Sequence, residues 1–97
     1  MQKRGYTYIL TNKNNTVLYV GVTSDLEKRI DQHRNGVFKN AFTSKYNVYK
    51  LVYFEEYDSV ESAIAREKQL KAGSRKKKTD LINNKNPHWE ELYKGIQ

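Results

Sequence analysis

Two short strand-like segments joined by a polar turn constrain the fold of this chain more than any other feature. Residues 6–10 and 17–22 are rich in aromatic and β-branched side chains, which favour extended backbone. Between them, residues 11–16 contain Asn12, Asn14 and Asn15, and asparagine is typical of turns. The pattern predicts a β-hairpin, so the chain must build a sheet and cover its apolar surface.

The hairpin is followed by a helix signal and a third strand. Ser24 with Glu27 matches a capping box, and apolar positions at helical spacing continue to about residue 34. A loop containing Asn35, Gly36 and Asn40 leads to residues 47–56, a segment with the composition of a strand. The sheet is therefore expected to have three strands.

Two further helices are predicted in the second half of the chain. Asp58 and Glu61 form another capping-box candidate, and Gly73 should end the helix that they begin. The apolar stripe expected on that helix consists of Val60, Ala63, Ile64 and Leu70. Ser74 can cap a third helix that runs to about residue 84, and a last turn should pack Trp89, Leu92 and Tyr93.

The order ββαβαα predicts an α+β fold, in which helices flank a small, three-stranded, mainly antiparallel sheet. With 97 residues, of which 37% are hydrophobic, we expect one domain over residues 1–97. The chain has no cysteine, which excludes disulfide frameworks and thiolate metal sites. No apolar run approaches the roughly 20 residues that cross a bilayer, so we expect a soluble, cytoplasmic protein with no membrane partner.

The chain is strongly basic, and some of its cations form a dense block. The net charge is +7 and the isoelectric point is near 9.6. Five cations lie within eight residues: Lys71, Arg75, Lys76, Lys77 and Lys78. Such a block favours salt-dependent binding of nucleic acid, although a basic run can also be an ordinary solvated helix surface.

Three polar side chains interrupt the apolar helix stripes. Glu67 lies on the stripe of the second helix, where a buried carboxylate must meet a cation or a metal ion, or become protonated. The ordinary alternatives to a metal site are an ion pair with Arg29 and a place at the edge of the stripe. Arg29 could clamp a phosphate or could merely cover apolar surface with its stem. His33 titrates in a useful pH range but could also serve only in packing.

Tyr8 and Tyr19 lie on the two strands of the predicted hairpin and could be close across it. Most tyrosines in strands serve in packing, and this chain has eight of them. A phenol beside a cation could instead accept or relay a proton from a water molecule that attacks phosphorus.

Taken in order along the chain, these residues resemble the motifs of the GIY-YIG nuclease family, in its small single-domain branch. Tyr6-Thr7-Tyr8 matches the first motif at its final tyrosine, and Tyr19-Val20-Gly21 closely matches the second. The family's helical arginine falls on Arg29 and its metal-binding glutamate on Glu67. His33 falls where the family carries a tyrosine, histidine or lysine. Asn86 is a candidate for the family's late asparagine, with a helix stop as its other role.

The resemblance implies a metal-dependent endonuclease that hydrolyses phosphodiester bonds in DNA, or in RNA, in the repair or processing of structured DNA. It implies that Glu67 holds Mg²⁺ or Mn²⁺, that Arg29 neutralises charge on the phosphate, and that Tyr8 or Tyr19 assists as general base. A non-catalytic nucleic-acid-binding module with the same fold is the alternative. A homodimer, or a partner protein that supplies specificity, is a further option.

Overall fold

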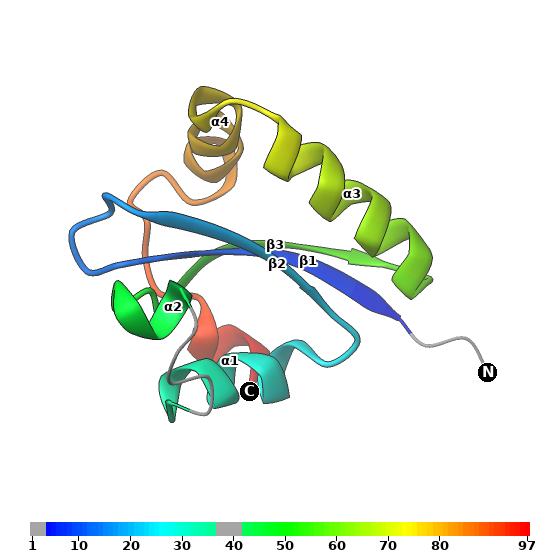
Figure 1. Cartoon of the computed structure of the whole chain (residues 1–97), viewed down its shortest axis with the longest axis horizontal. Coiled ribbons are helices and arrows are strands. Elements are labelled where there is room, and N and C mark those ends of the chain that lie inside the picture. The colour runs from blue at the N-terminus through cyan, green and yellow to red at the C-terminus, as the bar shows by residue number, and fades with distance from the viewer. Residues whose placement is uncertain (1–3, 37–41) are drawn as a thin grey trace.

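The computed structural model describes residues 4–36 and 42–97, and its centre is a three-stranded antiparallel sheet (Figure 1). Strand β1 (Gly5–Thr11) lies between β2 (Leu18–Thr23) and β3 (Lys50–Tyr57). β1 and β2 form the predicted hairpin, and the side-chain oxygen of Asn12 accepts hydrogen bonds from two backbone N–H groups of the turn, at 2.8 and 3.0 Å. The central strand is therefore β1, and β2 and β3 are the edges.

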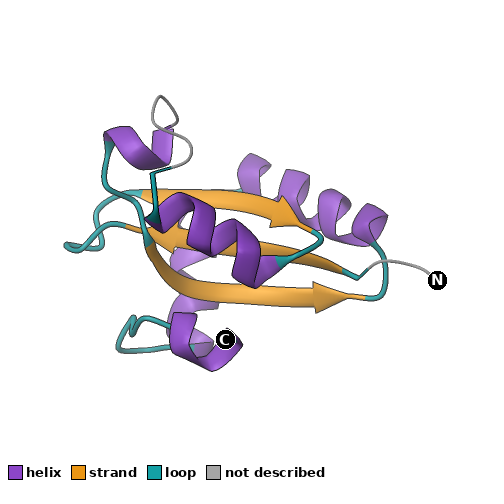
Figure 2. Ribbon diagram, turned by 90° about the horizontal axis from the view of Figure 1, so that it is seen from below, coloured by secondary structure: helices purple, strands orange, loops and turns teal. Residues whose placement is uncertain are grey.

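Helices cover both faces of this sheet. The helical elements are α1 (Leu26–Arg34), α2 (Phe42–Lys45), α3 (Val60–Ala72), α4 (Arg75–Lys85) and the 3-10 helix η1 (Tyr93–Ile96). α3 and α4 lie on one face, and α1 and η1 lie on the other (Figure 1 and Figure 2). The predicted α+β class, antiparallel sheet and order ββαβαα are confirmed, with α2 and η1 as additional short elements.

Each face of the sheet has its own apolar core, because alternate residues of a strand point to opposite faces. The core beneath α1 consists of Tyr8, Leu10, Leu26, Ile30, Val48 and Leu51. The core beneath α3 and α4 consists of Ile9, Val20, Val52, Tyr53, Leu70 and Ile82. Trp89 packs against the second core, and Leu92 and Tyr93 pack against the first, as expected.

The helix starts are shifted by one residue from two of the three predicted caps. Asp25 caps α1 in place of Ser24, and Ser59 caps α3 in place of Asp58; each side chain accepts from the backbone N–H three residues later, at 3.1 and 3.2 Å. Ser74 caps α4 as predicted. Serine and aspartate cap equally well, so only the geometry at the end of each strand selects between neighbours.

One other expectation differs from the structure, and one short helix was not expected. Ile64 is 37% exposed and does not belong to the core, because α3 packs through the narrower stripe that contains Ala63 and Leu70. The sequence gives no sign of α2, a single turn that is too short to show apolar periodicity. Asn40, expected in the preceding loop, lies outside the described residues. Among the residues that the structure describes, no helix has the length and apolar character needed to cross a membrane.

Candidate active site

Tyr8 passes its ring across the neighbouring strand at a glycine. Tyr8 on β1 pairs with Gly21 on β2, and its side chain is completely buried. A Cβ atom at Gly21 would lie 2.4 Å from both the Cζ and the hydroxyl oxygen of Tyr8. Gly21 is therefore needed because the end of the Tyr8 ring occupies the space of a side chain. This steric reason for the Tyr-x-Gly motif cannot be read from the sequence.

The imidazole of His33 is a hydrogen-bond partner of the Tyr8 hydroxyl. Its Nε2 atom lies 3.3 Å from the Tyr8 hydroxyl, and its Nδ1 atom lies 3.0 Å from Oγ1 of Thr43. His33 and Thr43 are both buried. Thr43 is a residue that sequence reasoning missed, because α2, which carries it, was not predicted. The contact between His33 and Thr43 belongs to no sequence motif, and it forms only when α2 packs beside α1.

Arg29 lies beside the Tyr8 hydroxyl. Its guanidinium lowers the pKa of Tyr8, against the larger effect of burial. Two proton arrangements satisfy the contacts of His33, because the Tyr8 and Thr43 hydroxyls can each donate or accept. In the arrangement in which Tyr8 donates to Nε2, His33 carries its proton on Nδ1 and donates to Thr43. Tyr8, His33 and Thr43 therefore form a chain of contacts along which a proton can pass.

The protonation states follow from burial and charge. Burial is the main cause that raises the pKa of Tyr8 above its usual range, and the nearby acidic groups of Tyr19 and Glu67 raise it further. The positive charge of Arg29 lowers the pKa of Tyr8 but does not cancel this effect. Burial and the nearby Arg29 charge lower the pKa of His33 to about 4. At neutral pH, Tyr8 is a protonated phenol and His33 a neutral imidazole that can accept a proton.

Tyr19 lies beside this pair on the hairpin. Its ring centre is 6.4 Å from that of Tyr8 and 5.9 Å from that of His33. The nearness of Tyr8 and Tyr19 that the sequence suggested is therefore present in the structure. Tyr19 is only half-buried, whereas Tyr8 is covered completely. Tyr19 therefore forms the outer part of the group.

A small polar hollow opens beside Arg29. It has a volume of about 300 Å³ and is lined by residues from the end of β2 and the outer side of α1: Thr23, Ser24, Asp25, Lys28, Arg29 and Gln32. Lys28 and Arg29 supply two cations to its wall, and Asp25 supplies one carboxylate that caps α1. The excess of one positive charge, with the fork of Arg29, would suit a small anionic group such as a phosphate.

Glu67 belongs to the helix layer on the opposite face of the sheet. α3 packs against β1 and β2, and the side chain of Glu67 is 16% exposed. Its ion pair is with Lys71, one turn later, at 3.4 Å. The carboxylate contributes to the raised pKa of Tyr8, which places it within electrostatic range of the phenol. Glu67 therefore influences the Tyr8 phenol electrostatically from the other layer.

The acidic groups near this site limit the kind of metal ion that could bind. Within residues 4–36 and 42–97, no three or more His, Cys, Asp or Glu side chains come together as a metal site. Zinc, which takes three or four protein ligands, does not fit. A lone, mostly shielded carboxylate with one long ion pair fits Mg²⁺ or Mn²⁺, because magnesium keeps several waters and shares its ligands with substrate phosphates.

The predicted nucleic-acid-binding cations gather where α3 ends and α4 begins. They are Lys71, Arg75, Lys76, Lys77 and Lys78. Lys71 is engaged with Glu67, and Lys76 pairs with Asp80 at 2.8 Å. Both pairs are of the i, i+4 kind. The Lys76–Asp80 pair is exposed, so it contributes little to stability and can be exchanged for phosphate contacts, whereas the Lys71–Glu67 pair joins a half-exposed lysine to a shielded carboxylate.

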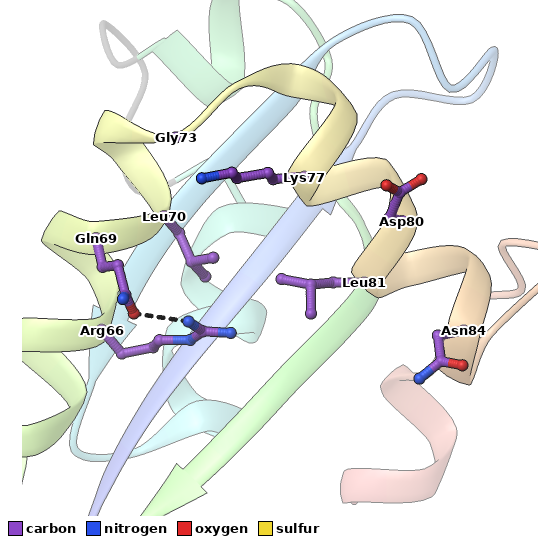
Figure 3. A pocket seen from close by; sticks show the side chains of 8 residues that line it. All are labelled: Arg66, Gln69, Leu70, Gly73, Lys77, Asp80, Leu81 and Asn84. Atoms are coloured by element: carbon purple, nitrogen blue, oxygen red, sulfur yellow. Dashed lines mark hydrogen bonds between the residues drawn. The ribbon is translucent and has the colours of Figure 1, made fainter.

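A larger hollow of about 580 Å³ lies between α3 and α4, away from the tyrosines (Figure 3). Its wall includes Arg66, Leu70, Lys77 and Leu81. The Arg66 guanidinium donates hydrogen bonds to Oε1 of Gln69 at 2.7 Å and to the two carboxylate oxygens of Glu55 on β3 at 2.9 and 3.1 Å. The Arg66 guanidinium in this wall is therefore already paired within the protein.

Comparison with known proteins identifies the family. Residues 4–80 match the profile of the GIY-YIG catalytic domain. The chain belongs to the GIY-YIG family. A UPF0213 protein of Clostridium perfringens is 40% identical over 91 residues, which cover 94% of this chain and 96% of that one. A UPF0213 protein of Syntrophus aciditrophicus is 38% identical over 79 residues, or 81% of this chain and 90% of that one.

A solved structure agrees with the GIY-YIG assignment. The solution NMR structure of a UPF0213 protein from Bacillus halodurans has a TM-score of 0.57 and 34% sequence identity, with 94% of this chain and 95% of that chain covered. The resemblance to the small branch of the GIY-YIG family is thus confirmed. The roles of the individual site residues remain predictions.

Asn86, the candidate for the late GIY-YIG asparagine, has a structural role. Its amide nitrogen donates to the carbonyl oxygens of Val52 and Glu90 at 3.0 and 2.9 Å, and its oxygen accepts from the Glu90 backbone N–H at 3.0 Å. The side chain is buried. Asn86 therefore ties the C-terminal segment to β3, in addition to ending α4.

Proposed function

We propose that this protein is a metal-dependent endonuclease that hydrolyses phosphodiester bonds in DNA, in the repair or processing of structured DNA. The observation that carries the proposal is the Tyr8, His33 and Thr43 hydrogen-bond chain, with Arg29 and a polar hollow beside it, in a GIY-YIG domain. GIY-YIG domains are typically nuclease domains. The net charge of +7 supports a polyanionic substrate.

Arg29 is the residue that we expect to bind the phosphate. Its guanidinium lies beside the Tyr8 hydroxyl, and the residue also lines the polar hollow. A phosphate in the hollow would attract the guanidinium fork, which binds two phosphate oxygens more strongly than one phenol. Arg29 then neutralises the charge that develops on phosphorus.

Tyr8 is the residue best placed to take a proton from the attacking water. As the water oxygen bonds to phosphorus, one of its protons passes to the Tyr8 oxygen while the phenol proton passes to Nε2 of His33. The Arg29 charge is one of the two causes that hold the pKa of His33 low, so its neutralisation by phosphate makes His33 a better acceptor. Tyr19 orders the water from the exposed side.

Glu67 would hold a divalent ion together with water molecules and phosphate oxygens. When bound, Mg²⁺ or Mn²⁺ polarises the phosphoryl oxygen and stabilises the leaving 3′ oxygen. The Glu67 side chain could exchange its contact with Lys71 for such an ion, since the two groups are 3.4 Å apart and the lysine is half-exposed.

The test is cleavage of supercoiled plasmid and of labelled branched, single-stranded and double-stranded DNA, with RNA alongside, in Mg²⁺, Mn²⁺ or EDTA. We expect metal-dependent nicking that is lost in Glu67→Ala and Arg29→Ala. The matched control is Glu61→Ala, which removes an exposed carboxylate from the same helix and should retain activity. Circular dichroism checks that each variant is folded.

The proposal fails if the wild-type protein binds these substrates at low salt but cuts none of them. It also fails if cleavage persists in EDTA, or if both site variants cut as well as the control. Binding without cutting would instead favour the non-catalytic nucleic-acid-binding module.

A further inference from the structure

Two aromatic side chains, one at the start of α2 and one directly after its end, are exposed to solvent. In the described part of the chain, three large hydrophobic side chains are exposed: Phe42 at 46%, Tyr46 at 44% and Ile64 at 37%. Phe42 and Tyr46 lie against each other, with ring centres 4.7 Å apart and planes inclined by 48°. We refer to these two residues as the aromatic patch. Isolated exposed apolar residues are common, but two adjacent flat rings form a surface with a specific shape.

The aromatic patch is continuous with the candidate active site. The Phe42 ring lies 6.3 Å from the ring of Tyr19, with the planes only 24° apart. Tyr19 in turn lies against His33. Thr43, the residue after Phe42, is the partner of His33 Nδ1. The segment formed by α2 and the residue after it therefore carries both the hydrogen-bond partner of His33 and an aromatic surface beside the candidate site.

The surroundings of the patch indicate the chemistry of its occupant. Lys45 lies with its ammonium 5.5 Å from the centre of the Tyr46 ring, and the chain as a whole carries a charge of +7. A ligand that satisfies both features has planar aromatic groups on an anionic backbone. A second copy of this chain would bring the same positive charge and is disfavoured by repulsion.

Base pairing decides which form of DNA can use such a surface. In a continuous duplex, base faces are stacked on their neighbours and are unavailable to a protein ring. In a single strand, flap, bulge or splayed end, a base can stack on an aromatic side chain, whatever its sequence. Exposed rings next to the candidate site therefore favour DNA with unpaired bases over an uninterrupted duplex.

We propose that Phe42 and Tyr46 stack on an unpaired DNA base next to the phosphate that is cut, so that the substrate is DNA with a single-stranded segment at the cleavage site. This inference rests on the proposed function and specifies its substrate class. The stacked base would lie on the outer side of Tyr19, and the adjoining phosphate would lie in the hollow beside Arg29.

Binding measured in EDTA tests the patch without cleavage. The probes are a single-stranded oligonucleotide, a flap with 2-aminopurine at the first unpaired position, and a blunt duplex of equal length. Phe42→Leu keeps an apolar side chain but removes the aromatic face, and Phe42→Trp retains a face. Ile64→Leu is the matched exposed control on α3.

We expect Phe42→Leu to weaken binding of the single strand and the flap by about 5- to 100-fold. Duplex binding should change by less than about twofold, since phosphate contacts dominate it. The wild-type protein and Phe42→Trp should quench the 2-aminopurine fluorescence, whereas Phe42→Leu should not. Tyr46→Leu should act in the same direction, and Ile64→Leu should have no effect.

Three results would overturn the inference: equal losses on duplex and single strand, no loss at all, or concentration-dependent self-association that disappears in Phe42→Leu. The last result would identify a second copy as the occupant. Because binding is read in EDTA, an inactive protein that still prefers unpaired bases through Phe42 would refute the proposed function alone. A protein that cuts duplex as well as flap DNA, with Phe42→Leu unimpaired, would refute this inference alone.

Discussion

Gly21→Ala should destabilise the protein through Tyr8, although neither residue is charged and the change is one methyl group. The new Cβ would lie 2.4 Å from Cζ and from the hydroxyl oxygen of Tyr8, and 2.8 Å from Cε2. Ordinary carbon contacts lie at about 3.5–4.0 Å, so the end of the ring must move by more than about 1 Å. The ring is rigid and completely buried, with its hydroxyl 3.3 Å from His33.

The size of the effect follows from two opposing contributions. Overpacking of a buried site costs about 1–3 kcal/mol. Replacing glycine by alanine where the backbone allows it returns about 0.4–1 kcal/mol, mainly through the unfolded chain. We expect a net loss of about 1–2 kcal/mol, and a fall in Tm of about 4–8 °C for each kcal/mol in a chain of this size. Nuclease activity should fall further, because the displaced hydroxyl leaves Nε2 of His33.

Urea and thermal unfolding, followed by circular dichroism, measure the change. Gly95→Ala is the matched control, since a Cβ there meets nothing within 4 Å and should leave stability unchanged or slightly raised. Tyr8→Leu removes the atoms that clash, so adding Gly21→Ala to it should cost little. The steric account is refuted if Gly21→Ala is as stable as the wild type, or if it costs as much in the Tyr8→Leu protein as alone.

Three further predictions concern the relay, the C-terminal tie and the basic surface. The pKa of His33 is about 4 in the folded protein, below its value in the unfolded chain. As the pH falls, His33 is therefore protonated first in the unfolded chain, which favours unfolding. The contribution of His33 to stability is complete above about pH 6.5 and falls as the pH drops towards 4. Urea titrations across this window should show a steeper loss for the wild type than for His33→Gln, and parallel curves would contradict the assignment. Asn86→Ala should lose about 1–3 kcal/mol of stability through unpaired backbone groups, whereas Asn84→Ala, at an exposed position, should lose almost nothing; equal melting curves would count against the tie. Arg75→Ala and Lys77→Ala should each weaken DNA binding and lower the slope of log affinity against log salt by about one, and an unchanged slope would remove these cations from the interface.

The elements that depend on neighbouring residues could be predicted from the sequence. Alternating aromatic and β-branched residues placed the hairpin, and Ser74 was identified as the cap of α4. Asp25 and Ser59 were missed by one position, because two adjacent residues with equal capping ability can be separated only by the course of the preceding strand. The family resemblance singled out Arg29 and His33, whose helical spacing put them on the same face as the core residue Ile30.

The arrangement of the candidate site depended on contacts between elements that are distant in the chain. The hydrogen bond between Tyr8 and His33 joins residues that are 25 positions apart, and α3 brings Glu67 towards Tyr8 from the opposite face of the sheet. Thr43 could not be found beforehand, because nothing in its own segment predicts a helix or a buried hydroxyl.

The sequence by itself determined the three strands and the three longer helices, the positive charge of the chain, and the glycine in the Tyr-x-Gly motif, because each depends on residue type and short spacing. Only the tertiary structure decided that Gly21 makes room for Tyr8, that His33 is buried and neutral, and that Phe42 remains exposed beside Tyr19. The physical reason is that steric fit, desolvation and proton affinity depend on all the groups that surround a side chain, and most of those groups come from other parts of the chain.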